Sequence, residues 1–255
     1  MRNLEQFIQE KSKGDYRITV VPCTGSTNQD LRAAAKEGAP EGTVLFAEEQ
    51  RAGRGRMGRN FFSPKGSGLY FSILLRPHGG DAIKITAAVG VAVARAVEEI
   101  LGIDLKIKWV NDLYYRGKKV CGILAEGAIN QKGGFEYCIL GIGLNVAAPK
   151  EGFGALDQIA GALLEQTDAQ QRAALAASIL DHFFAIYRQL EDGAYMREYQ
   201  ARSFLQGKKI LLARGEEEIS CTVEGISEEG ALLAVDAQGE HHAFTSGEVQ
   251  IRCFD

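Results

Sequence analysis

The segment Gly53–Arg59 (GRGRMGR) places three glycines and three arginines within seven residues. Glycine lets a backbone approach a ligand closely, and each arginine offers planar donors that suit a carboxylate or a phosphate. The spacing matches G-x-G-x-x-G, but residues 60–64 and a predicted strand follow instead of a helix, which argues against a dinucleotide site. A surface hairpin is the alternative interpretation. Three mutually repelling arginines favour an anion-binding loop.

Four further segments place polar residues or glycines where a ligand could approach the backbone. Lys108–Leu113 (KWVNDL) and Lys119–Leu124 (KVCGIL) could form only a hairpin. Gly141–Val146 (GIGLNV) has two glycines in an apolar strand, which is typical of a bulge or a close backbone approach. Gly25–Gln29 (GSTNQ) precedes a predicted helix, where simple N-capping would explain it. No single one of these segments identifies a function.

The charge of the 255-residue chain is unevenly distributed. Lys and Arg total 29 against 33 Asp and Glu, a net charge of −4, whereas a generic nucleic-acid-binding protein is expected to be basic. Residues 51–65 carry five basic side chains and no acidic one, and residues 106–119 carry five against Asp112 alone. Two compact positive segments in a mildly acidic chain favour a small anionic ligand.

Other classes of site and location are not indicated. The five cysteines include no C-x-x-C pair, which argues against a structural zinc site and a disulfide framework. The most apolar stretch, Ile83–Val97, is too short and interrupted to span a bilayer. The N-terminus lacks the apolar region of a secretory signal. We therefore expect a soluble, cytoplasmic protein with no membrane partner.

Strand-like and helix-like segments alternate before residue 206. Strands are predicted at Arg17–Cys23, Thr43–Ala47, Leu69–Leu75, Leu105–Trp109, Lys118–Glu126 and Phe135–Val146. Helices are predicted at Gln29–Lys36, at Asp81–Leu101 and over most of residues 156–204.

The C-terminal segment has a different pattern. Short strands separated by turns that contain glycine are predicted at Ile210–Ala213, Ser220–Ile226, Leu232–Val235, His241–Thr245 and Val249–Arg252. This spacing is typical of a small β-barrel. Residues 1–206 have a net charge of +2 and residues 207–255 a net charge of −6. We therefore predict a catalytic domain at 1–206 and a barrel domain at 207–255.

In combination, the motifs resemble those of the biotin protein ligases. The matching segments are Ser26–Asn28, Glu48–Arg59, Lys108–Leu113, Lys119–Glu126, Gly141–Val146 and Ser246–Val249. The likeness covers roughly residues 17–255. The resemblance implies an α+β fold with a mixed β-sheet flanked by helices, of the class II aminoacyl-tRNA-synthetase-like or biotin–lipoate ligase type. It also implies an SH3-like β-barrel at the C-terminus.

The resemblance implies a two-step reaction that needs biotin, ATP and Mg²⁺. The biotin carboxylate first attacks the α-phosphorus of ATP, which gives biotinyl-5′-AMP and pyrophosphate. The biotinyl group then passes to one lysine of a biotin carboxyl carrier protein. Such a site must bring two anions together and exclude water from a mixed anhydride. No side chain is assigned as a metal ligand.

The resemblance also implies roles for individual residues. Lys119, Arg54 and Asp112 are assigned as catalytic, with Lys119 as the main electrostatic group. The implied biotin-binding residues are Ser26, Thr27, Asn28, Gln50, Gly53, Arg54, Arg56, Lys119, Gly122 and Gly141. The implied ATP-binding residues are Arg54, Arg56, Arg59, Asn111, Asp112, Lys119 and Asn145. Trp109 could line the pocket or belong to the core.

Alternatives remain at this point. Only 25 residues precede Ser26, too few for the DNA-binding domain of bifunctional members, so a monofunctional ligase without a nucleic-acid partner is expected. A homodimer is plausible by analogy with relatives. A lipoate or octanoate ligase of related fold would need a long apolar tunnel, and a non-catalytic biotin-sensing module is the other alternative. Retention of Lys119 and the three loop arginines favours an active ligase.

Overall fold

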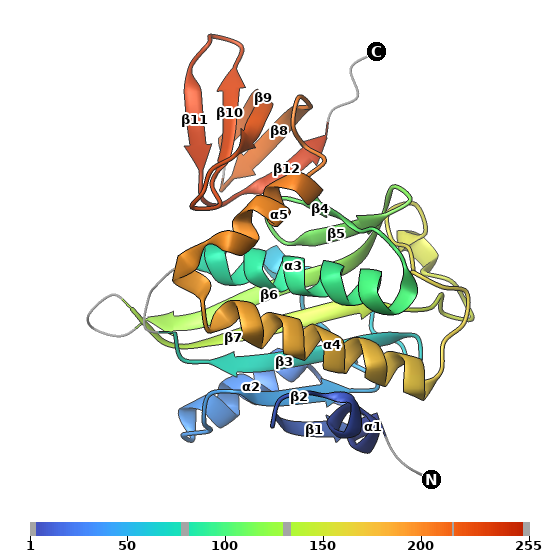
Figure 1. The fold of residues 1–255 in the computed structure, drawn as a ribbon. Coiled ribbons are helices and arrows are strands. Elements are labelled where there is room, and N and C mark those ends of the chain that lie inside the picture. The colour runs from blue at the N-terminus through green and yellow to red at the C-terminus, as the bar shows by residue number, and fades with distance from the viewer. Residues whose placement is uncertain (1–3, 78–81, 130–133, 216, 252–255) are drawn as a thin grey trace.

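The computed structural model describes residues 4–77, 82–129, 134–215 and 217–251 (Figure 1). Two β-sheets form its framework. In Figure 1 the second sheet, in orange and red, lies beside α5 and the end of the main sheet that carries β4 and β5.

The main sheet has seven strands in the order β1-β2-β3-β7-β6-β5-β4. Their bounds are β1 Arg17–Val21, β2 Thr43–Ala47, β3 Gly68–Leu75, β4 Lys106–Lys108, β5 Asp112–Tyr115, β6 Lys118–Ile129 and β7 Phe135–Asn145. β1 and β2 are parallel and all other neighbours are antiparallel, which confirms the predicted mixed sheet.

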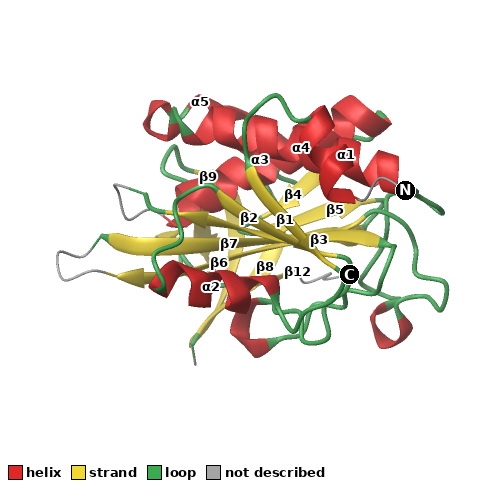
Figure 2. Cartoon of the chain, turned by 90° about the horizontal axis from the view of Figure 1, so that it is seen from below, coloured by secondary structure: helices red, strands yellow, loops and turns green. Residues whose placement is uncertain are grey.

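Helices cover both faces of this sheet, as Figure 2 shows. Their bounds are α1 Leu4–Lys11, α2 Thr27–Lys36, α3 Ala82–Leu101, α4 Ala169–Tyr187 and α5 Ala194–Arg202. α2 lies alone on one face, and the other four lie on the opposite face. Short 3-10 turns occupy Arg56–Gly58, Gly154–Leu156 and Leu190–Asp192. None of the described helices is long and apolar enough to cross a membrane.

The core explains why these segments form these elements. Every residue of β3 is buried, because it lies between β2 and β7 with helices on both sides. The apolar stretch noted in the sequence is the buried part of α3, which packs against α4. On the opposite face, Leu31 and Ala35 of α2 pack against Leu74 and Ile139. α2 therefore packs on β3 and β7 in the middle of the sheet.

The second sheet has the order β11-β10-β9-β8-β12, and all its neighbouring strands are antiparallel. The bounds are β8 Lys209–Arg214, β9 Glu217–Ile226, β10 Leu232–Asp236, β11 His241–Phe244 and β12 Glu248–Ile251. The predicted closure into a barrel is wrong for the described residues. A closed barrel needs a ladder between the two edge strands of the sheet, and β11 and β12 do not pair with each other.

Other predictions differ from the structure in detail. α1 was not predicted, and residues 157–168 form a loop that contains only turns and isolated bridges where helix was expected. Asp112 begins β5, a strand between the predicted strands that was not predicted from the sequence. The predicted helix start at Asp81 and the strand end at Arg252 lie outside the described residues. The division into domains at residue 207 stays a prediction.

Candidate functional site

A cavity of about 370 Å³ opens on the face of the main sheet that carries α2. Its walls come from the Gly/Arg loop (residues 53–59), the start of α2, β4 to β7, residues 153–160 and β12. The predicted site residues that line it are Ser26, Thr27, Asn28, Gln50, Arg54, Arg56, Arg59, Asn111, Asp112, Lys119, Gly122, Gly141 and Asn145. Segments distant in the sequence thus meet at one site.

Glycines form the floor of the cavity because other side chains occupy the space above them. β-pairing places Gly122 beside Gly143, and Gly141 lies two residues away on the same face. A Cβ at Gly143 would lie 2.5 Å from the Phe61 ring, and one at Gly141 would overlap the Asn28 amide. Gly141 is thus required for the position of Asn28.

Gly53 is the predicted binding residue that is not among the described lining residues. A Cβ there would overlap the carbonyl oxygen of Phe61 and lie 2.8 Å from Ser63 Oγ. The Phe61 N–H donates to the Gly53 carbonyl at 2.8 Å, which closes the base of the Gly/Arg loop. This geometry explains the glycine, and direct ligand binding by Gly53 stays a prediction.

Two arginines of the loop, Arg56 and Arg59, are held by the β4–β5 connection and by the C-terminal end of the second sheet. Arg56 donates to Asn111 Oδ1 at 3.0 Å and to the Gly247 carbonyl at 2.8 Å. Arg59 forms a two-point contact with the Glu248 carboxylate at 2.6 and 2.7 Å. The loop is therefore fastened to β12 and to the turn before it.

Lys119 of β6 and Asp112 of β5 form an ion pair on the cavity wall. The Lys119 Nζ lies 2.6 Å from Asp112 Oδ1, but that buried oxygen has no aligned hydrogen-bond donor among the described residues. We therefore treat the contact as electrostatic. Burial lowers the pKa of Lys108, which also lines the cavity, and the charge of Lys119 lowers it further while Asp112 raises it.

The start of α2 forms a polar end of the cavity. The Thr27 N–H donates to Gln50 Oε1 at 3.0 Å, and Gln50 Nε2 donates to Ser63 Oγ at 3.0 Å. Ser26 is buried, but its side chain makes no capping hydrogen bond to the helix. N-capping by the side chain therefore does not explain Ser26.

Several lining residues had no role in the sequence-based assignment. They are Lys108, Phe61, Phe153, Leu156, Ile159, Glu248 and Val249. Lys108 lies inside a motif that was recognised, so its charge was a usable signal. Glu248 reaches the cavity only because the second sheet packs there, which no local pattern reveals. Trp109 has both roles considered for it, since it lines the cavity and is buried with its Nε1 donating to the Gly230 carbonyl at 2.9 Å.

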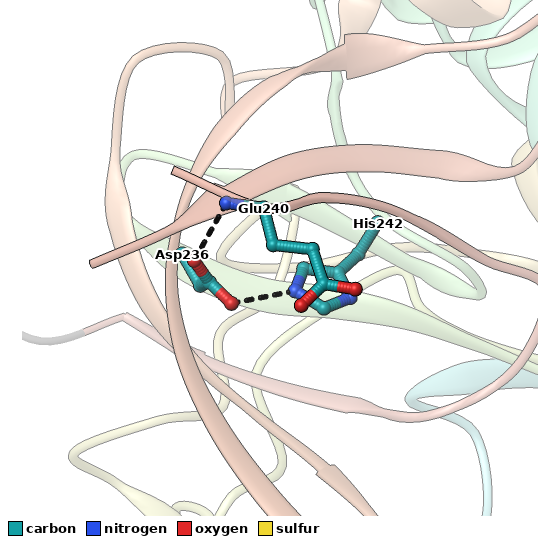
Figure 3. A group of neighbouring side chains, drawn as sticks. All are labelled: Asp236, Glu240 and His242. Atoms are coloured by element: carbon teal, nitrogen blue, oxygen red, sulfur yellow. Dashed lines mark hydrogen bonds and ion pairs between the residues drawn. The ribbon is translucent and has the colours of Figure 1, made fainter. Parts of the chain in front are cut away.

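A separate cluster in the second sheet has potential metal ligands, Asp236, Glu240 and His242 (Figure 3). Asp236 accepts hydrogen bonds from the Gln238 and Glu240 backbone N–H groups, both at 2.9 Å, and its other oxygen lies 2.8 Å from His242 Nε2. The hydrogen bond with His242 is the main cause that lowers the pKa of Asp236. These contacts stabilise the β10–β11 hairpin, so the cluster is not assigned as a metal site.

Comparison with known proteins identifies the family. Residues 20–145 match the model of the biotin/lipoate A/B protein ligase family, and residues 207–252 match that of the biotin protein ligase C-terminal domain. The biotin–[acetyl-CoA-carboxylase] ligase of Mycobacterium tuberculosis is 31% identical, over 97% of this chain and 94% of its own length. The chain belongs to the biotin protein ligase family.

Other relatives are consistent with this membership. The bifunctional ligase/repressor BirA of Escherichia coli is 29% identical over 98% of this chain and 78% of that protein. A biotin protein ligase from Aquifex aeolicus, solved in complex with biotin and ATP, aligns with a TM-score of 0.75 and 28% identity. That alignment covers 92% of this chain and 98% of the Aquifex chain. The biotin/lipoate ligase fold expected from the sequence is therefore confirmed.

Proposed function

We propose that the chain activates biotin with ATP in this cavity and transfers the biotinyl group to a lysine of a biotin carboxyl carrier protein. The observation that carries the proposal is that one cavity joins a polar end at Thr27 and Gln50 to a cluster of cations. Biotin has the matching polarity, with a ureido ring at one end and a carboxylate at the other. The Aquifex relative with biotin and ATP supports the same pair of ligands.

In the first step, a carboxylate oxygen of biotin forms a bond to the α-phosphorus of ATP, and the bond from that phosphorus to the pyrophosphate oxygen breaks. Lys119 is suited to stabilise negative charge between the two reacting groups. Arg54 would orient the carboxylate, and Arg56 and Arg59 would bind phosphate oxygens after leaving Gly247 and Glu248. These roles are part of the proposal.

In the second step, the neutral amine of the carrier lysine attacks the acyl carbon of the adenylate. A C–N bond forms, the C–O bond to AMP breaks, and the amine loses a proton. Asp112 is the residue proposed to receive that proton or to interact with Mg²⁺. Its Oδ1 lacks an aligned donor among the described residues, so its chemistry fits a cation. A Mg²⁺ bound with ATP would neutralise phosphate charge, and Asp112 is a lining carboxylate that would be available to interact with it.

The alternatives are weaker. A lipoyl or octanoyl group has no N–H or carbonyl that would use the polar end of the cavity, and the match to a biotin protein ligase C-terminal domain favours biotin. A non-catalytic sensor would not require both Lys119 and the loop arginines at the cavity wall. A cytoplasmic location, a homodimer and the lack of a nucleic-acid partner stay predictions from the sequence.

The test uses purified protein with ATP, Mg²⁺ and biotin, lipoate or octanoate in parallel. We expect biotin-dependent pyrophosphate release, the mass of biotinyl-5′-AMP, and a biotinyl mass increase on an apo carrier domain. The Lys119→Ala variant is the matched control and should form little adenylate. Release that depends on lipoate or octanoate, or no release with biotin, would contradict the proposal.

A further inference from the structure

A chain of hydrogen bonds connects Glu126 on β6 to Thr27 on the cavity wall. Asn28 Nδ2 donates to Glu126 Oε2 at 2.9 Å, Ser72 Oγ donates to Asn28 Oδ1 at 2.6 Å, and the Ser72 and Thr27 hydroxyl oxygens lie 2.7 Å apart. Thr27, Asn28 and Ser72 are 2%, 4% and 0% exposed. Glu126 and Ser72 are not among the described lining residues. Any influence of Ser72 on a ligand therefore passes through Thr27 and Asn28, whereas Glu126 also lies 3.7 Å from the lining residue Arg54.

The chemistry of the groups sets the direction of every hydrogen bond in this chain. An ionised carboxylate only accepts, so Asn28 must present its NH₂ to Glu126 and its carbonyl to Ser72. The Ser72 proton is then used on Asn28. Two hydroxyl oxygens 2.7 Å apart need a proton between them, so Thr27 must donate its own to Ser72.

The neighbours of the chain reinforce this direction. The second oxygen of Glu126 lies 2.9 Å from an Arg32 nitrogen and 3.7 Å from an Arg54 nitrogen. Gln50 Oε1 accepts the Thr27 N–H and is a second, more distant acceptor for the Thr27 hydroxyl at 3.2 Å, so the hydroxyl proton is used on the protein with either partner. The Thr27 hydroxyl is therefore left with lone pairs for a group in the cavity.

We propose that Glu126 and Ser72 are positioning residues that make the Thr27 hydroxyl a hydrogen-bond acceptor and so select ligands with an N–H donor at this end. The inference rests on the proposed function and deepens it. The ureido ring of biotin offers two N–H donors, whereas lipoyl and octanoyl groups offer none. Discrimination between these acids thus depends on a carboxylate outside the cavity.

The test compares two ligands on two variants. The ligands are biotin and 5-(thiolan-2-yl)pentanoic acid, which keeps the carboxylate and the thiolane ring but lacks the ureido group. The first variant is Ser72→Ala, which removes the hydroxyl between Asn28 and Thr27. The second is Glu126→Gln, whose amide can accept or donate and therefore no longer fixes the orientation of the Asn28 amide. Ser67→Ala is the matched control, because Ser67 has a buried hydroxyl that bonds Pro64 and Tyr70 and takes no part in the hydrogen bonds between Glu126 and Thr27.

Calorimetry should show the biotin Kd raised about tenfold in Ser72→Ala and about threefold in Glu126→Gln, the range expected for one hydrogen bond. The Kd of the ureido-free acid should stay within twofold of its wild-type value in both variants. The affinity of the wild-type protein for this acid gives the binding that remains without the ureido group. Steady-state adenylation should show a raised KM for biotin with kcat nearly unchanged. Ser67→Ala should lower thermal stability without changing either Kd.

Three outcomes would overturn the inference. Unchanged biotin Kd values in both variants would do so. An equal rise in the Kd of both ligands would also do so, because it would indicate that these hydrogen bonds only maintain the structure. A wild-type protein that binds no biotin would overturn the proposed function together with the inference. Because the first two outcomes leave wild-type biotin binding intact, the two failures are distinguishable.

Discussion

Gly141→Ala is a sharp test of how the cavity is built. The added Cβ would overlap Asn28 Oδ1 and lie 2.9 Å from Asn28 Cγ, whereas carbon atoms prefer a separation of about 3.5–4.0 Å. The amide must therefore shift by roughly 0.6–1 Å. Its hydrogen bonds with Glu126 and Ser72, at 2.9 and 2.6 Å, would not both survive that shift.

The magnitude follows from what is lost. A buried polar group without its partner costs about 1–3 kcal/mol, and overpacking a core costs a similar amount. We take about 2 kcal/mol for Gly141→Ala, which corresponds to a fall in Tm of about 4–8 °C for a protein of this size. The biotin Kd should rise about tenfold, because the displaced Asn28 no longer orders Thr27.

The assay combines thermal unfolding with calorimetric biotin titration. Gly225→Ala on β9 is the matched control, since a Cβ there would meet no atom within 4 Å and the φ angle is not positive. It should change stability by less than about 0.5 kcal/mol and leave the Kd unaltered. Adding Asn28→Ala to Gly141→Ala should restore part of the Tm but not the affinity. A Gly141→Ala variant with wild-type Tm and Kd would refute the reasoning.

Three other outcomes follow from the charges at the site. Lys119→Met should slow adenylate formation by about 10²–10³-fold, as seen in pyrophosphate release, with little change in Tm because its ion pair with Asp112 is partly exposed. Burial lowers the pKa of Lys108, so its charge is present at low pH and is lost at lower pH than for an ordinary lysine. The KM for ATP should therefore rise at alkaline pH as Lys108 loses its charge, and Lys108→Arg should move that rise to higher pH. An unchanged pH profile of KM in this variant would show that Lys108 is not the group responsible. Glu248→Gln should release Arg59 and speed tryptic cleavage after it by up to about fivefold, and unchanged cleavage would contradict a fastening role.

The sequence predicted those features that depend on local patterns. β-branched runs marked the strands of the main sheet, and a long apolar stretch marked α3. The glycines on β6 and β7 could be recognised as places of close approach because glycine is unfavourable inside a strand. The side chains that fill the space above these glycines could not be predicted. That the Asn28 amide lies over Gly141 depends on where α2 docks, and no spacing along the chain encodes it.

Features that depend on packing between distant segments were missed for the same reason. Glu248 and Val249 lie in the matched segment Ser246–Val249, which predicted a strand of the C-terminal domain but no place in the site, and they line the cavity because the second sheet docks there. Ser72 and Tyr70 carry the two hydroxyls of a mostly apolar strand, and the hydrogen bond from Ser72 to Asn28 is visible only in three dimensions. The error about barrel closure is of this type, because the pattern of a single strand does not specify whether the two edge strands of the sheet pair with each other.

The pairing of the cationic side chains suggests how the cavity discriminates among anions. Arg59 is held by Glu248, Lys119 by Asp112, and Arg56 by Gly247 and Asn111. An anion that binds Arg59, Lys119 or Arg56 must displace one of these partners, so the attraction it gains is offset by the contact that is broken. Biotin and ATP together supply one carboxylate and three phosphates, enough to engage several of these cations at once. The exchange of partners therefore favours the joint presence of both substrates over binding of a lone anion.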